Sequence, residues 1–161
     1  MWASSSRRRE GFTLIEVMIV LAIAGLILLV VFLAVPALQR NARNTTRRED
    51  TGNILAAVNE YVANNNGSLP SGVSGSGSSL TVGTGATVNT VPVTMGYYTY
   101  SATNITVTAQ ATYGTTNNTT TDTVAIVTGA ICNGNDPASG SSRSVVILYT
   151  VEPTGKQCKQ S

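Results

Sequence analysis

Few residues of this 161-residue chain have side chains suited to chemistry. Histidine is absent, so the chain lacks an imidazole for metal binding or acid–base catalysis, and the Ser-His-Asp and Cys-His arrangements of hydrolases are excluded. What remains is one carboxylate at an apolar run, Glu16, and two cysteines, Cys132 and Cys158. Two cysteines alone make a poor zinc site, and theirs is not the C-x-x-C spacing of redox sites. We therefore expect a protein that is not an enzyme and that holds no metal or cofactor.

Charge is scarce and unevenly distributed. The chain has 10 Lys and Arg against 8 Asp and Glu, a net charge of +2, and residues 61–121 contain no charged side chain. Most of the arginines precede Asp50, so a general nucleic-acid-binding surface is not indicated. The Gly/Ser cluster at 72–79 lacks the Gly-Lys-Ser/Thr ending of a phosphate-binding loop.

An uninterrupted apolar run, Val17–Val35, dominates the N-terminal part. As a helix it would be roughly 28 Å long, close to the ~30 Å hydrocarbon core of a bilayer. It is longer than the apolar region of a secretory signal peptide, and residues 36–39 make a poor cleavage site for signal peptidase. The rest of the chain has too few large apolar residues to enclose it. The run therefore predicts a membrane-spanning helix behind a short basic leader.

Glu16 stands where this apolar run begins. An ionised carboxylate in such a place costs up to a few kcal/mol, so it is a candidate functional residue. It could lie in the headgroup zone of the membrane. Otherwise it needs a cation from another molecule, because no Lys or Arg lies between Gly11 and Arg40.

The segment Arg9-Glu10-Gly11, followed by Phe12-Thr13-Leu14-Ile15-Glu16 and an apolar helix, resembles the class III signal of type IV prepilins. The resemblance extends from Arg9 to about Val35. It implies that prepilin peptidase cuts between Gly11 and Phe12 and that the new N-terminal amine of Phe12 is methylated. It also implies that Glu16 pairs with the cationic N-terminus of a neighbouring subunit during assembly, which gives Glu16 the partner its own chain lacks.

The resemblance further implies a structural subunit of a type IV pilus, a helical polymer of this chain. The precursor would cross the cytoplasmic membrane once, leader inside and head outside. An assembly platform and ATPase-driven machinery would then build it into an extracellular filament. Motility, adhesion or DNA uptake would belong to that filament, so nucleic acid would be contacted only through it.

The net charge of the chain after the expected cleavage favours a structural subunit over a charged enzyme or binding protein. Loss of residues 1–11 leaves 7 of the 10 basic and 7 of the 8 acidic residues, so the mature side-chain charge is zero. The alternative is a pseudopilin or minor pilin of a type II secretion or competence pseudopilus. A third possibility is an unprocessed membrane-anchored enzyme, which no catalytic arrangement of residues supports.

We expect an α+β pilin fold, in which a long N-terminal helix packs on a C-terminal antiparallel β-sheet. The helix would run from about Phe12 to Asn65, where Asn64-Asn65-Asn66-Gly67 supplies a stop signal. It would have a transmembrane or filament-core part at 12–38 and an amphipathic part at 39–66. Gly25, Pro36 and Gly52 are its predicted weak points. The amphipathic part would dock on the head through a periodic apolar face formed by Ile54, Leu55, Val58, Tyr61 and Val62.

The remaining chain would form the head. Residues 67–96 are rich in Gly, Ser and Thr and predict an αβ loop or a flexible linker. Residues 97–161 would form an antiparallel sheet of about four strands, with one face on the helix and a Thr-rich face in water. The strands are expected at Tyr97–Tyr100, Ile105–Tyr113, Val124–Val127 and Val145–Val151, separated by turns such as Gly114–Asn118 and Asn133–Ser142.

Cys132 and Cys158 lie in the part that the resemblance places outside the cell, where oxidising conditions favour pairing. The resemblance implies a disulfide between them that bounds an exposed C-terminal region. Closing a loop of this length stabilises a fold by roughly 3.5 kcal/mol. The region carries Asp136, Arg143, Glu152 and Lys156, which either tune contacts between subunits or are solvated surface charges.

Overall fold

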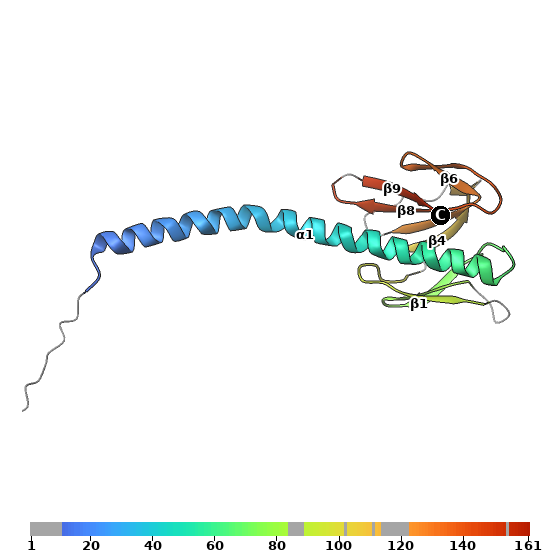
Figure 1. Ribbon diagram of the computed structural model, residues 1–161, viewed down its shortest axis with the longest axis horizontal. Coiled ribbons are helices and arrows are strands. Elements are labelled where there is room, and N and C mark those ends of the chain that lie inside the picture. The colour runs from blue at the N-terminus through green and yellow to red at the C-terminus, as the bar shows by residue number, and fades with distance from the viewer. Residues whose placement is uncertain (1–10, 84–88, 102, 111, 114–122, 154) are drawn as a thin grey trace, which may run out of the picture. The chain divides into compact units, whose positions relative to one another are not determined.

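A computed structural model describes residues 11–83, 89–101, 103–110, 112–113, 123–153 and 155–161 (Figure 1). The predicted leader therefore lies outside the described residues except for Gly11, as does the predicted turn at Gly114–Asn118. The elements are one helix and a series of strands: α1 (Leu14–Asn64), β1 (Val73–Ser76), β2 (Ser79–Val82), β3 (Val91–Thr94), β4 (Ile105–Ala109), β5 (Val124–Thr128), β6 (Ala130–Asn133), β7 (Asp136–Ser139), β8 (Val145–Val151) and β9 (Gly155–Gln160). This is the α+β class expected from the sequence, with the helix packed on sheets.

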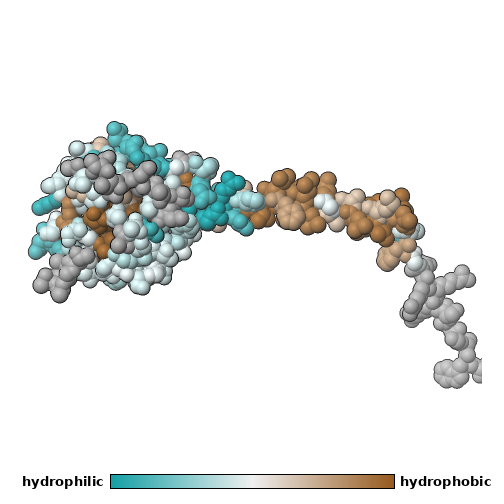
Figure 2. Space-filling view, turned by 180° about the vertical axis from the view of Figure 1, so that it is seen from behind, coloured by the Kyte–Doolittle hydropathy of each residue, from teal (hydrophilic) through white to brown (hydrophobic). Residues whose placement is uncertain are grey.

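The chain divides into two compact units, residues 1–39 and 40–161. The first unit contains the N-terminal part of α1, and its large apolar side chains from Phe12 to Leu38 are all exposed, by 38% to 89%. They form a nearly continuous apolar surface in Figure 2. By length and composition α1 could cross a membrane, and its most apolar stretch has no buried residue. The helix is continuous through Gly25, Pro36 and Gly52.

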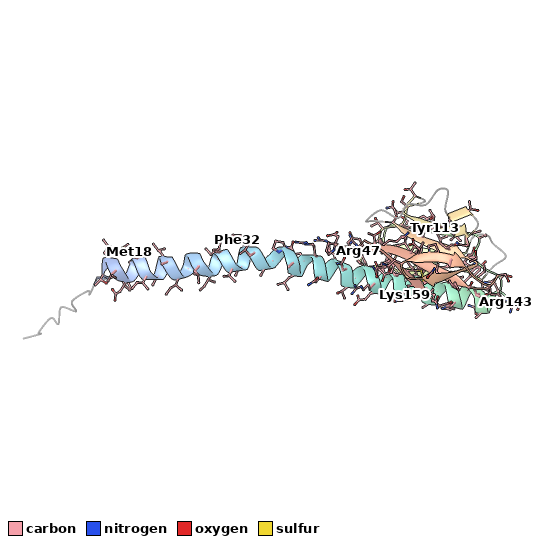
Figure 3. All side chains as sticks on the ribbon, turned by 90° about the horizontal axis from the view of Figure 1, so that it is seen from above. Met18, Phe32, Arg47, Tyr113, Arg143 and Lys159 are labelled. Carbon is pink, nitrogen blue, oxygen red and sulfur yellow. A yellow bond between two sulfur atoms is a disulfide. The ribbon has the colours of Figure 1, made fainter. Side chains whose placement is uncertain are left out.

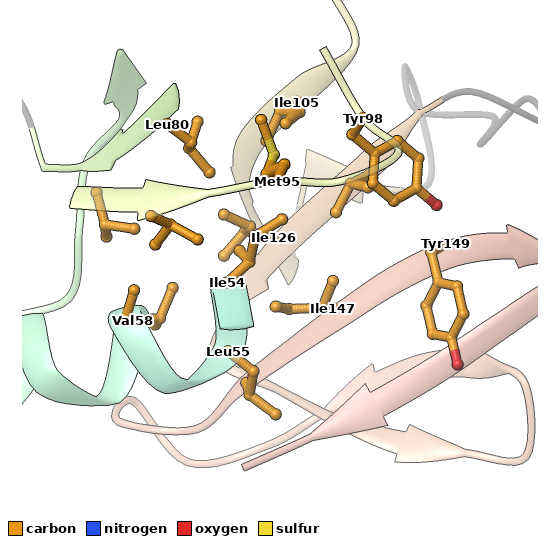
Figure 4. Packing of buried hydrophobic residues seen from close by; sticks show 14 of the residues in the cluster. Ile54, Leu55, Val58, Leu80, Met95, Tyr98, Ile105, Ile126, Ile147 and Tyr149 are labelled. Atoms are coloured by element: carbon orange, nitrogen blue, oxygen red, sulfur yellow. The ribbon is translucent and has the colours of Figure 1, made fainter. Parts of the chain in front are cut away.

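The second unit contains the C-terminal part of α1 and all the described strands. The predicted apolar face of the helix is confirmed at Ile54, Leu55, Val58 and Tyr61, which are buried, whereas Val62 is half-buried. Ile54 lies in one core cluster with Ile126 and Ile147 (Figure 4). Helix α1 ends as the Asn-Gly signal predicts, because Asn66 and Gly67 have positive φ angles of 54° and 82°. The Gly67 N–H donates to the Val62 carbonyl at 2.8 Å, which caps the last turn.

The expectation of a loop over residues 67–96 was wrong for much of that segment. Strands β1, β2 and β3 pair antiparallel there into a separate sheet. The physical reason is that short apolar alternations within the Ser/Thr-rich stretch, at Leu80, Val82, Val91 and Val93, are buried in the core that contains Ile54. Residues 84–88, between β2 and β3, lie outside the described residues.

The second sheet has the order β4-β5-β8-β9 and is mixed, not wholly antiparallel as expected. Strands β5, β8 and β9 pair antiparallel, but β4 pairs parallel with β5, from Ile105 opposite Val124. Parallel neighbours need a connection of about a dozen residues or more, and residues 110–123, most of which lie outside the described residues, separate the two strands in sequence. The strand expected over Ile105–Tyr113 ends at Ala109, and Gln110, Thr112 and Tyr113 are helical.

The expected strand at Tyr97–Tyr100 was also wrong. This segment is bent backbone, and only Tyr100 makes an isolated bridge, to Gly77. The backbone N–H groups of Gly96, Tyr97 and Tyr98 turn toward the carboxylate of Asp50 on α1 instead of toward a neighbouring strand. A buried carboxylate that accepts three backbone N–H groups satisfies them as a sheet would.

The face of the second sheet away from the first core is not open to water, contrary to expectation. A second apolar cluster lies there, and β6 and β7 form a hairpin beside it that contacts β8 and β9. Strands β5 and β8 are the central strands of this sheet. They are apolar on both faces because an apolar cluster covers each face. The cluster consists of Tyr113, Ala125, Val127, Ala130, Val146 and Leu148.

Candidate functional site

The first feature of the candidate site is the start of α1. Leu14 is the first helical residue, and the carbonyl of Thr13 accepts the first helical hydrogen bond from the Val17 N–H at 3.4 Å. The Glu16 carboxylate oxygen Oε2 accepts from the Thr13 N–H and from the Thr13 hydroxyl, both at 2.7 Å. The Glu16 N–H is 3.4 Å from the Thr13 hydroxyl oxygen. Thr13 and Glu16 therefore form a capping box at the N-terminus of the helix.

This capping box gives Glu16 a partner that the sequence analysis missed. The signal was present, because Thr-x-x-Glu directly before an apolar run is the sequence pattern of a capping box. A carboxylate is also favoured near the positive end of a helix. The role expected for Glu16 in pairing with another subunit remains a prediction, but its carboxylate is already engaged within its own chain.

The residues expected to flank the cleavage site precede the capping box. Gly11 and Phe12 are non-helical, and the Phe12 side chain is 89% exposed. Beside them, Val17, Val20 and Leu21 line a shallow apolar depression together with Phe12 and Glu16. Side chains farther along α1, such as Met18 and Phe32, project outward from the helix (Figure 3). The site thus combines one carboxylate, non-helical backbone and a long exposed apolar surface.

Cys132 on β6 and Cys158 on β9 are joined by a disulfide, with their Cα atoms 5.8 Å apart. The bond attaches the β6–β7 hairpin to the edge strand β9, and both cysteines pack against the second apolar cluster. Lys156 and Asp136 form an ion pair between β9 and β7. The Cys132 N–H donates to the Gln160 side-chain oxygen at 3.0 Å. The hairpin is therefore held to the sheet by three separate links.

A polar cluster in the second unit was not anticipated. The Arg47 side chain is 1% exposed, and its Nη2 lies 3.1 Å from Glu152 Oε1. Arg47 also donates to the Tyr97 hydroxyl, and its guanidinium carbon lies 4.3 Å from the centroid of the Tyr97 ring. Arg43 reaches the other carboxylate oxygen of Glu152 at 3.1 Å.

The charges of this cluster shift one another's pKa values. Hydrogen bonds from Arg43 and then from Arg47 hold the pKa of Glu152 below its ordinary value. Burial opposes the charge on Arg47, but its bonds to Tyr97 and Glu152 outweigh burial and raise the pKa of Arg47. Both groups are therefore charged at neutral pH.

Asn44 and Asp50 extend the cluster along the same helix. Asn44 exchanges hydrogen bonds with the backbone N–H and carbonyl of Glu152. Asp50 accepts from the N–H groups of Gly96 and Tyr97 at 2.7 Å and of Tyr98 at 3.0 Å. The sequence did contain a signal, because the buried face of α1 follows one alternating three- and four-residue spacing through Asn44, Arg47, Thr51, Ile54, Val58 and Tyr61. Polar residues on that spacing belong to the core.

In the part of the chain that the structure describes, no group of three His, Cys, Asp or Glu residues could hold a metal ion.

Comparison with known proteins identifies the N-terminal segment. Residues 6–32 match the family model described as the prokaryotic N-terminal methylation motif. No curated protein and no solved structure matches the chain. The matched residues include the expected cleavage site, the capping box and the first part of the exposed apolar helix. This chain carries the class III signal peptide of type IV pilins, and its long N-terminal apolar helix fits a precursor of the type IV pilin or pseudopilin kind.

Proposed function

We propose that this chain is a structural subunit of a type IV pilus. Prepilin peptidase cleaves the precursor between Gly11 and Phe12 and methylates the Phe12 amine. The pilus assembly platform and its ATPase-driven machinery then move the mature subunit from the cytoplasmic membrane into an extracellular filament. The protein is not an enzyme, and motility, adhesion or DNA uptake are properties of the filament.

The exposed apolar surface of α1 is the observation that carries this proposal. A soluble monomer rarely exposes a contiguous apolar patch of more than a few hundred Å². Here every large apolar side chain from Phe12 to Leu38 is exposed. Such a surface is stable either in lipid or against copies of the same helix, and a pilin meets these two environments in turn.

Glu16 supplies the electrostatic part of the proposal. Its carboxylate lies at the start of the apolar segment, among Phe12, Val17, Val20 and Leu21. Cleavage after Gly11 creates a cationic amine at Phe12 of every subunit. In a filament built from buried helices, an ionised carboxylate needs a cation close by. The amine of a neighbouring subunit meets that need.

The experiment that tests the proposal is intact-mass and N-terminal peptide mass spectrometry on filaments sheared from the native cells. We expect abundant chains that begin at N-methylated Phe12 and are two hydrogens lighter than the reduced form because of the Cys132–Cys158 bond. A processed chain found only at trace level in cell membranes would instead indicate a pseudopilin or minor pilin. A chain that retains Met1 in the cell would overturn both assignments.

A further inference from the structure

The boundary between non-helical and helical backbone lies very close to the proposed cleavage site. Gly11 and Phe12 are outside α1, and the helix begins two residues after Phe12. The boundary is fixed by the capping box, in which Glu16 accepts from both the N–H and the hydroxyl of Thr13. The residue pair that starts the helix therefore also limits how far it reaches toward the Gly11–Phe12 bond.

We propose that Thr13 and Glu16 are positioning residues for the cleavage itself. By starting α1 at Leu14, the capping box holds the Gly11–Phe12 peptide bond in non-helical backbone, the form a peptidase can attack. This inference rests on the proposed function, because it concerns the same cleavage. It gives Glu16 a task in the precursor, before any assembly takes place.

The chemistry of cleavage explains why helical backbone would be a poor substrate. Water adds to the carbonyl carbon of Gly11, the C–N bond to Phe12 breaks, and the Phe12 nitrogen leaves as an amine after taking up a proton. If α1 extended over residue 11, the Gly11 carbonyl would accept a hydrogen bond from the Ile15 N–H, and the helix would hinder approach to that carbonyl. The reacting groups need aligned, close geometry, which helical backbone does not offer.

The membrane makes such a boundary hard to maintain without a cap. Backbone polar groups near lipid have little water to bond to, so a helix there tends to lengthen until its N–H groups are satisfied. The capping box removes this tendency at Leu14, because the Glu16 carboxylate satisfies the Thr13 N–H and the Thr13 hydroxyl faces the Glu16 N–H. Gly11 adds to the effect, because glycine is unfavourable inside a helix.

Substitutions at Thr13 test this inference, because Thr13→Asn keeps the ability to cap the helix but changes the shape of the side chain, whereas Thr13→Val keeps the shape but cannot cap. The full-length precursor in detergent micelles is incubated with prepilin peptidase, and initial cleavage rates are measured. We expect Thr13→Ser and Thr13→Asn to be cleaved within about twofold of the wild-type rate, because both residues are good N-caps. Thr13→Val and Thr13→Ala should be cleaved about fivefold more slowly, the factor that corresponds to a typical loss of an N-cap.

A matched control is available on the same helix. The Thr45 hydroxyl donates to the Asn41 carbonyl within α1 and caps nothing. We therefore expect Thr45→Val to be cleaved at the wild-type rate. NMR of the same precursors provides the structural readout, since Thr13→Val should give helical carbon shifts at Phe12 and at residue 13 where the wild type does not.

The outcomes separate the inference from the proposed function. If Thr13→Val is cleaved as fast as wild type while Thr13→Asn is slow, the peptidase recognises side-chain shape and the positioning role is overturned. Equal rates across the series, or unchanged carbon shifts in Thr13→Val, overturn it as well. A wild-type precursor that the peptidase does not cut contradicts the proposed function itself.

Discussion

The two halves of α1 differ in where they find their partners. From Leu14 to Leu38 the helix exposes every large apolar side chain, and its described side-chain hydrogen bonds are those of Glu16 with Thr13. From Arg40 onward the same helix buries Ile54 and Val58 completely and even encloses the guanidinium of Arg47. The apolar face of the C-terminal half is buried against its own chain, whereas the apolar side chains of the N-terminal half are left exposed.

The two halves of α1 differ in the kind of contact that organises them. Asn44, Arg47 and Asp50 hold the second half in place through bonds to Glu152 and to the backbone at 96–98. The first half has one organising feature, the Thr13–Glu16 capping box. We therefore expect changes in the second half to alter stability, and changes in the first half to alter assembly.

The largest expected effect is at Glu16. Glu16→Ala should still be cleaved, although more slowly, but should reduce filament yield at least tenfold because an uncompensated amine would be buried in the filament. Glu16→Gln should also fail to assemble, yet should be cleaved faster than Glu16→Ala, because glutamine can close the capping box. Sheared filaments are quantified against total processed subunit.

Glu60→Ala is the matched control, because Glu60 is an exposed glutamate on the second half of α1. It should yield filaments as wild type does. Wild-type filament yield from Glu16→Ala would refute the pairing of Glu16 with a neighbouring N-terminus.

The same substitution at one isoleucine in each half sharpens the comparison. Ile54 is fully buried and Ile27 is 55% exposed. Ile54→Ala should lower the free energy of unfolding of the second unit by about 4 kcal/mol through lost burial and a cavity. Ile27→Ala should leave it within about 0.5 kcal/mol of wild type. Urea unfolding of the full chain in detergent, followed by near-ultraviolet circular dichroism, measures both, and equal losses would contradict the division into two halves.

The disulfide should give a somewhat smaller effect, confined to the second unit. Cys132 and Cys158 are separated by 26 positions, and the chain-entropy argument gives about 3.5 kcal/mol for a closed loop of that size. We expect Cys132→Ser combined with Cys158→Ser to lose about that much stability in the same urea experiment. Reduction of the wild-type chain serves as the control and should reproduce the loss, whereas a loss below 1 kcal/mol would mean that other contacts hold the β6–β7 hairpin.

The sequence predicted the parts of this molecule that depend on local pattern. The apolar run, the buried face at Ile54 and Val58, and the helix end at Asn66-Gly67 all follow from periodicity or backbone preference. The methylation motif was also visible, because it is a contiguous pattern. The capping box was local too and could have been found from the Thr13 to Glu16 spacing.

Features that depend on contacts distant in sequence were missed. The pairing of β4 with β5 is parallel, and no local pattern encodes that direction. Arg47 is buried against Tyr97 and Glu152, which lie 50 and 105 residues away along the chain, so no local pattern reveals its partners. Likewise, an apolar cluster lies on the second face of the sheet, with the β6–β7 hairpin, which lies between β5 and β8 in sequence, beside it.

The smallest expected effect is a pH dependence of the second unit. Hydrogen bonds from Arg43 and Arg47 lower the pKa of Glu152 in the folded chain below its unfolded value, which is about 4.3 for glutamate. A lowered folded pKa means that the unfolded chain binds the proton more readily, so the contribution of Glu152 to stability is fully present above about pH 5 and declines as the pH falls through the folded value.

Glu152→Gln removes this titration. We therefore expect the loss of stability between pH 5 and pH 3 to be shallower in Glu152→Gln than in wild type, with Glu60→Gln, an exposed site, following wild type. Identical pH profiles for Glu152→Gln and wild type would show that the arginines of α1 do not stabilise the ionised carboxylate, and the contacts that hold the second half of the helix would then be its apolar face, Asp50 and the bonds of Asn44 to the Glu152 backbone.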